Sequence, residues 1–111
     1  MYNNNMNNIG YINFEWNEHK AESNKIKHDV LFDDASTVFY DPYARIIDDP
    51  DHLITEDRFV IIGLSSKALV LTVCYCLRNN DETIRIISAR KATKNESKQY
   101  WRYCHEEWIW F

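Results

Sequence analysis

Three apolar runs separated by short polar breaks constrain the fold of this chain more than any other feature. The runs cover residues 58–64, 68–77 and 83–89, and the breaks are Ser65-Ser66-Lys67 and Asn79-Asn80-Asp81. Both breaks are rich in turn-forming residues and short enough to join neighbouring antiparallel strands. The sequence therefore predicts an antiparallel meander. Apolar residues occupy both alternating sets of positions in these runs, so we expect cover on both faces of the sheet.

The region before the meander predicts a strand followed by a helix. Residues 12–16 alternate apolar and polar side chains, which is typical of a short strand, and Asn17 is a good N-cap for a helix running to about His28. This helix has little apolar face. Polar residues recur in it at intervals of four, three and one, which predicts a polar stripe along one side of the helix. The stripe consists of Lys20, Asn24, Lys27 and His28.

Two further helices complete the predicted fold. Apolar residues recur on one side over about 32–40, where Asp41-Pro42 should end the helix. After a short segment at 44–47 and the meander, Thr93 and Glu96 form a capping-box pattern for a last helix reaching about Trp108. The prediction is an α+β fold with a small antiparallel sheet, two N-terminal helices and a C-terminal helix.

Length and composition favour one globular domain. The chain has 111 residues, of which 45% are hydrophobic and 27% charged, and chains this short rarely divide their core. We expect the Asn-rich residues 1–11 to form a disordered tail and residues 12–111 to form the domain. An odd count of three cysteines, without metal-site spacing, is typical of buried thiols in a reducing compartment. With no apolar run of membrane length and no signal-peptide pattern, we expect a cytoplasmic protein with no membrane contact.

Charge is unevenly distributed along the chain. The net charge is −4, which alone argues weakly against nucleic acid. Residues 1–66 hold five basic and twelve acidic side chains, whereas residues 67–102 hold eight basic and three acidic ones. This asymmetry favours one basic surface that can bind an anionic partner.

Motifs along most of the chain resemble those of one known family. The matching residues are Phe14-Glu15-Trp16-Asn17, Lys20, Asn24, Lys27-His28, Phe32, Ala35, Phe39, Asp41-Pro42, Asp57-Arg58-Phe59, Gly63, the run from Ile84 to Thr93, Glu96 and Tyr100. On these residues, from about Ile12 to Tyr100, the chain resembles the BrnT family. The family usually has glycine after its Lys-His pair, and we expect Asp29 here to adopt the same left-handed conformation.

The resemblance implies a RelE-like fold and a toxin of a type II toxin–antitoxin system that acts as a ribonuclease. It also implies a partner, a ribbon-helix-helix antitoxin called BrnA, with operator DNA bound only through the antitoxin complex. Cleavage of RNA without a metal ion or other cofactor needs a proton carrier and fixed cations. The resemblance assigns these roles to His28, Arg58, Arg85 and Arg90. We expect RNA binding by Lys20, Lys27, Lys91 and Lys94.

Each candidate catalytic residue also has a structural alternative. His28 can satisfy the last carbonyls of its helix. Arg58 can pair with Asp57 or Glu56, Arg85 can pair across the sheet, and Arg90 can pair with Glu96. Alternation along a regular strand would place Arg85 and Arg90 on opposite faces. The two can reach one site only if a bulge or the strand end lies between them.

The aromatic C-terminal end predicts an interface. Trp101, Trp108, Trp110 and Phe111 exceed what one terminal helix can easily bury, and exposed aromatic groups of this kind mark partner surfaces. We therefore expect antitoxin binding at Trp108, Trp110 and Phe111, the alternative being a tail that folds back into the core. A second function remains open, in which the chain is a catalytically weak or inactive interaction module that binds an antitoxin and supports operator binding.

Overall fold

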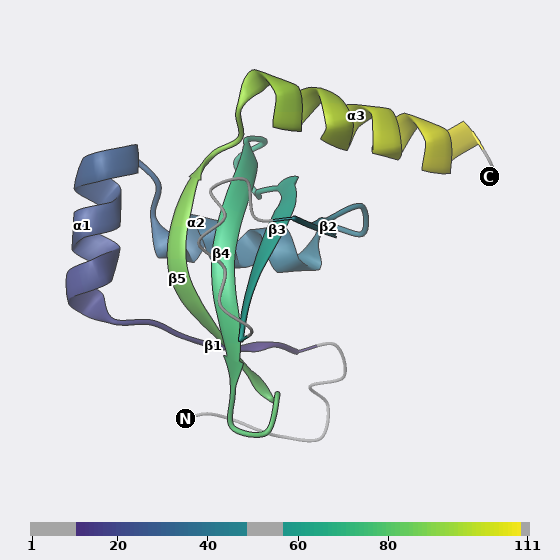
Figure 1. Ribbon diagram of the computed structural model, residues 1–111. Helices are drawn as coiled ribbons and strands as arrows, with labels where there is room; N and C mark the ends of the chain where they lie inside the picture. Colours follow the sequence, from purple (N-terminus) through teal and green to yellow (C-terminus); the bar gives the residue numbers. More distant parts are fainter. Residues whose placement is uncertain (1–10, 49–56, 110–111) are drawn as a thin grey trace.

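The predicted meander is present in the computed structural model, which describes residues 11–48 and 57–109, with side chains as far as residue 106. Its strands are β2 (Arg45–Ile47), β3 (Arg58–Leu64), β4 (Val70–Arg78) and β5 (Thr83–Lys91), each antiparallel to the next (Figure 1). The β4–β5 turn has positive φ angles of 54°, 58° and 68° at Asn79, Asn80 and Asp81. Asparagine and aspartate tolerate this conformation better than other non-glycine residues.

A parallel strand at one edge was not predicted. β1 (Asn13–Glu15) pairs with the first residues of β5, so that Glu15 lies opposite Arg85. The strand order is therefore β1-β5-β4-β3-β2. The predicted strand at 12–16 is confirmed in position, but its parallel pairing with a segment about seventy residues away depends on tertiary contacts that local patterns do not contain.

The N-terminal helices follow their predicted end signals. α1 (Glu18–His28) begins after Asn17, whose side-chain oxygen accepts a 3.0 Å hydrogen bond from the Lys20 amide. It ends at Asp29, which has the expected left-handed conformation with φ of 56°. The predicted helix over 32–40 is instead α2 (Phe32–Thr37) followed by the 3₁₀ turn η1 (Val38–Tyr40). The Thr37 hydroxyl donates a 2.6 Å hydrogen bond to the Asp34 carbonyl at this point, and such bonds compete with regular helix.

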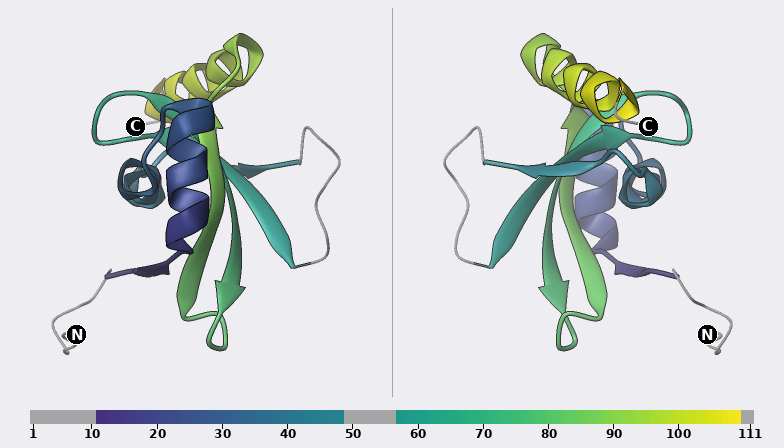
Figure 2. Two further views of the ribbon diagram at one scale, coloured as in Figure 1. Left: turned by 90° about the vertical axis from the view of Figure 1, so that its left-hand side faces the viewer. Right: turned by 90° about the vertical axis from the view of Figure 1, so that its right-hand side faces the viewer.

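The main core lies between the sheet and the α2–η1 segment. Side chains from both layers fill it: Val30, Phe32, Ala35, Val38, Ile61, Leu71, Val73, Tyr75, Ile86 and Ala89. Gly63 allows η1 to approach β3, since a Cβ atom there would lie 2.7 Å from a Val38 methyl group. The other face of the sheet is opposite to α2 (Figure 2). We call it the open face, although Val60 and Ile62 on it are buried.

The last helix crosses one end of the sheet. α3 (Lys94–Ile109) runs across the strands in Figure 1 instead of along them. Tyr100 is buried, and its hydroxyl donates a 2.5 Å hydrogen bond to the Asp41 carboxylate. Burial and this carboxylate both raise the pKa of Tyr100. The Leu64 amide donates to the same Asp41 oxygen, at 2.7 Å, so one carboxylate holds α3 to the end of β3.

Part of the predicted aromatic interface lies outside the described residues. Trp110 and Phe111 lie outside the described residues, and Trp108 lies in α3 but beyond the last described side chain. Most of the expected disordered tail at 1–11 is also outside the description. Within the described ranges, no helix has the length and apolar character needed to cross a membrane.

Candidate nucleic-acid interface

A β-bulge brings the candidate arginines to one face of the sheet. Cys74 pairs with Ser88 but Tyr75 pairs with Ile86, so Ile87 is an extra residue in β5. Beyond it, Arg90 pairs with Thr72, and before it, Arg85 pairs with Cys76. Thr72 and Cys76 are four positions apart on β4 and share a face, so Arg85 and Arg90 share it too. The bulge that the sequence argument required is present.

Arg58 lies on the same open face. Cys76 pairs with Arg58 of β3 as well as with Arg85 of β5, and the row continues to Glu15 of β1. Arg85 donates a 2.7 Å hydrogen bond to the Glu15 carboxylate, which confirms the predicted pairing across the sheet. No hydrogen bond or ion pair of the Arg58 side chain is found among residues 11–48 and 57–109. Two strand spacings place the Arg58 and Arg85 backbones about 10 Å apart.

Arg90 is held by Glu96 at the start of α3. The two side chains form paired hydrogen bonds of 2.8 and 3.0 Å, as the structural alternative predicted. Glu96 also accepts 2.9 and 3.0 Å bonds from the Thr93 amide and the Thr72 hydroxyl. The Glu96 amide donates to the Thr93 hydroxyl at 3.1 Å, which completes the predicted capping box. The Arg90 fork is thus fixed in orientation and largely neutralised.

These contacts predict a marked loss of stability in acid. Burial by itself raises the pKa of Glu96, but the bonds from Arg90, Thr93 and Thr72 lower it from 4.5 to about 2. The ionised carboxylate therefore stabilises the fold above about pH 4.5, and this stabilisation is lost as the pH falls toward 2. Urea unfolding should show a smaller decrease in stability over this interval for Glu96→Gln than for the wild type. Glu82→Gln, which changes an exposed carboxylate, should behave like the wild type; a Glu96→Gln variant that does the same would contradict the assignment.

One residue of the polar stripe of α1, Asn24, is hydrogen-bonded to β5, whereas Lys20 and Lys27 of the stripe are exposed. Asn24 is buried. Its amide donates to the Ala89 and Val30 carbonyls at 2.8 and 2.9 Å, and its oxygen accepts a 3.0 Å bond from the Ala89 amide. Asn24 thereby occupies the β5 edge beyond the point where β1 ends. Helix propensity does not reveal that Asn24 bonds to a strand, because this role depends on an unpaired strand edge elsewhere in the chain.

His28 lies one helical turn after Asn24. Four helical residues rise about 6 Å, close to two residues of a strand. Because α1 and β5 run in the same direction in Figure 1, His28 lies about level with Lys91, near the end of β5 where Arg90 is found. His28 is half-buried, and no hydrogen bond joins it to Arg58 or Arg85 in the described part of the chain. His28 thus lies at the same end of β5 as Arg90, whereas Arg58 and Arg85 lie at the row of Cys76, five positions or about 17 Å further along β4 than the partner of Lys91.

The candidate lysines are exposed but are not all on that face. Lys20 and Lys27 project from α1, and Lys94 begins α3. Lys91 pairs with the core residue Leu71, so alternation directs it toward the helix side. Lys20 lies in the first turn of α1, eight residues before His28, while Lys91 and Lys94 lie at the C-terminal end of β5 and the start of α3, so the four lysines do not form one cluster.

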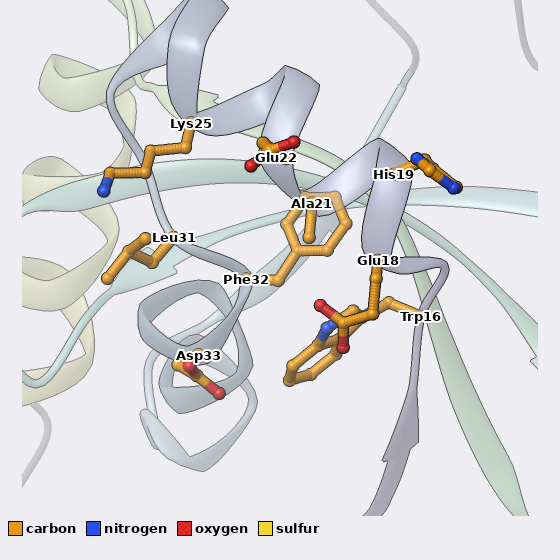
Figure 3. A pocket seen from close by; sticks show the side chains of 9 residues that line it. All are labelled: Trp16, Glu18, His19, Ala21, Glu22, Lys25, Leu31, Phe32 and Asp33. Carbon is orange, nitrogen blue, oxygen red and sulfur yellow. The ribbon is translucent and has the colours of Figure 1, made fainter.

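Two hollows lie on either side of the C-terminal half of β5 and α1, and the charges of their lining residues differ. The first, of about 590 Å³, lies between β2, the end of β5 and the first turns of α3, and its charged lining residues are Arg90, Lys91, Asp48 and Glu96. The second, of about 570 Å³, lies between α1 and α2 over Ala21 and Phe32 (Figure 3). Figure 3 shows carboxylates of Glu18, Glu22 and Asp33 around it. The cations and carboxylates of the first hollow are equal in number, whereas carboxylates are in excess around the second, so the first disfavours a phosphate less.

A comparison with protein families identifies the chain. The profile described as ribonuclease toxin, BrnT, of type II toxin-antitoxin system matches residues 16–96. The chain belongs to the BrnT family. This membership confirms the resemblance found in the sequence, and it implies that the protein acts in a toxin–antitoxin pair.

A solved BrnT structure has the same fold. The crystal structure of the ribonuclease toxin BrnT from Brucella abortus superposes with a TM-score of 0.58 over 75% of this chain and 99% of that one. The two sequences are 22% identical, so the likeness extends to the fold alone. Comparison with the curated proteins gave no match.

Sequence reasoning missed three residues that organise this BrnT-family site. Thr72 supports Glu96, and Glu15 neutralises Arg85. Arg45 lies on the open face through its pairing with Ile62. Strand alternation was the signal available for Thr72 and Arg45, but it identifies a face only after the pairing of strands is known.

Proposed function

We propose that this BrnT-family protein is a metal-independent endoribonuclease toxin that cleaves RNA on the open face of its sheet. The observation that carries the proposal is the bulge-dependent placement of Arg58, Arg85 and Arg90 on that face, in a chain whose family is one of ribonuclease toxins. Arginine forks are well suited to phosphate, and they stabilise the additional charge of a transition state.

The proposed reaction is transfer of the phosphate to the neighbouring 2′-hydroxyl. A base removes the 2′ proton, a bond forms between the 2′-oxygen and phosphorus, and the bond to the 5′-oxygen breaks. An acid then gives a proton to the leaving 5′-oxygen. His28 is the proton carrier in this proposal, since histidine is the residue type best suited to such transfers at neutral pH. Arg58, Arg85 and Arg90 bind successive phosphates of the RNA, with Arg90 at the His28 end of β5 and Arg58 and Arg85 further along the sheet. Lys20, Lys27, Lys91 and Lys94 attract the RNA.

The partner in this proposal is a BrnA-like ribbon-helix-helix antitoxin, which binds operator DNA in complex with the toxin. Membership of a type II family supports a protein antitoxin. An apolar groove beside α3 supports docking near the C-terminal end: Trp101, 51% exposed, lines it together with Tyr43 and Leu64. We propose that Trp108, Trp110 and Phe111 extend this surface, because a large exposed aromatic patch marks an interface.

One experiment tests both the chemistry and the control by antitoxin. Purified protein incubated with RNA and a chelator should produce fragments with a 2′,3′-cyclic phosphate and a 5′-hydroxyl, and the purified antitoxin should stop their formation. Loss of cleavage on chelation, restored by a divalent ion, would contradict the metal-independent mechanism.

The interaction module is the second candidate function. The pairing of Arg85 with Glu15 and of Arg90 with Glu96 favours it, because both guanidinium groups already have carboxylate partners. Binding of the antitoxin without RNA cleavage, with and without divalent ions, would support this function and contradict the first.

A further inference from the structure

The direction of α3 places two of its residues over one row of the sheet. This row runs across four strands, from Arg90 through Thr72 and Ile62 to Arg45. Glu96 bonds to Thr72 within the row. Tyr103 follows Glu96 by seven residues, about 10.5 Å along the helix, while Arg45 lies two strands, about 10 Å, from Thr72. The two distances agree, and Tyr103 lies against Arg45.

Arg45 differs from the two paired arginines of this face. It is exposed, and its guanidinium carbon lies 4.4 Å from the centre of the Tyr103 ring. Unlike Arg85 and Arg90, it has no carboxylate partner among residues 11–48 and 57–109. A guanidinium over an aromatic ring keeps its edge donors available, and the ring restricts its orientation. The Tyr103 ring therefore restricts the orientation of the Arg45 guanidinium, while no carboxylate of the described residues pairs with it.

We propose that Arg45, oriented by Tyr103, is a further RNA-binding residue of the open face. This inference rests on the proposed ribonuclease function and deepens it. The free donors of Arg45 would bind a backbone phosphate of the same RNA molecule that Arg58, Arg85 and Arg90 contact. Ile47, two residues along β2 on the same face, lines the hollow that reaches Arg90, which gives the strand a continuous course from β5 to β2.

RNA fits this position better than a protein surface does. A planar cation that is exposed, stacked and unpaired suits a repeated anion, and contacts of this type give affinity without sequence preference. The apolar groove beside Trp101, which Tyr43 and Leu64 also line, is the surface suited to a protein partner.

The test measures RNA binding separately from cleavage. The probe is a fluorescein-labelled single-stranded RNA with 2′-O-methyl groups, which cannot undergo 2′-hydroxyl attack, and binding is followed by fluorescence anisotropy over a range of salt concentrations. Arg45→Ala should weaken binding about tenfold and lower the salt slope by about 0.7, the value for one phosphate contact on a single strand. Arg45→Lys and Tyr103→Leu should give intermediate losses, whereas Tyr103→Phe should bind like the wild type.

Arg102→Ala is the matched control, because it removes an exposed arginine one position from Tyr103 on the same helix. It should change affinity less than about twofold, as expected for a charge outside the contact. Melting temperatures of all variants report any purely structural role. A lowered melting temperature with unchanged affinity and salt slope would overturn the inference, as would loss of antitoxin binding with unchanged RNA binding. If the wild type binds the probe but fails to cleave ordinary RNA, the proposed catalysis fails while the Arg45 inference stands.

Discussion

Replacing His28 with alanine should lower the rate of RNA cleavage by about 100-fold or more, the usual contribution of a general acid–base residue. The affinity for 2′-O-methyl RNA should change little, because the imidazole acts on protons in this proposal and the arginines bind phosphate. The measurement is the single-turnover cleavage rate together with the dissociation constant. A loss confined to the rate would identify His28 as a catalytic residue and distinguish it from a helix-end histidine.

His19→Ala is the control for this experiment. His19 lies on the same helix and is exposed at the rim of the acidic hollow, and its removal should leave the rate unchanged (Figure 3). If His28→Ala cleaves RNA at the wild-type rate, the proton carrier must be sought elsewhere, and the structural alternative for His28 is correct.

The second large effect concerns stability. Asn24→Ala should lower the free energy of unfolding by about 3 kcal/mol or more, since each buried polar group left without a partner costs about 1–3 kcal/mol. The groups left unpaired would be the Ala89 amide and the carbonyls of Ala89 and Val30. Urea unfolding measures the change, and hydrogen exchange at the Ala89 amide should become faster.

Ser23→Ala removes an exposed hydroxyl from the neighbouring position on α1 and should have an effect below about 0.5 kcal/mol, as is usual for surface substitutions. An equally small effect of Asn24→Ala would mean that α1 is held to β5 mainly by apolar contacts.

Local sequence signals predicted most elements and several of their ends. The apolar runs and turn residues located β3, β4 and β5, while Asn17, Asp29 and Thr93 marked helix ends as expected. These predictions succeeded because caps and turns depend on short-range hydrogen bonds. The family resemblance was also visible in the sequence, in the residues between Phe14 and Tyr100.

The arrangement of the candidate site required the structure. The parallel pairing of β1, the burial of Asn24 and the stacking of Arg45 on Tyr103 all join segments distant in sequence. Strand alternation could state the condition under which Arg85 and Arg90 share a face, but it could not show that the condition is met. The face on which a side chain lies depends on the register between strands, and the sequence of one strand alone does not determine that register.

Because of the bulge at Ile87, the number of residues in β5 determines which side chains lie on the open face. One residue more than the ladder needs is inserted between Arg85 and Arg90, so removal of a single residue there would restore regular alternation. Arg90 would then point toward the helices, and Glu96 would lose its partner across the sheet end. Substitutions at Ile87 are therefore expected to be tolerated more readily than a deletion, because the chain needs a residue at this place more than it needs a particular side chain.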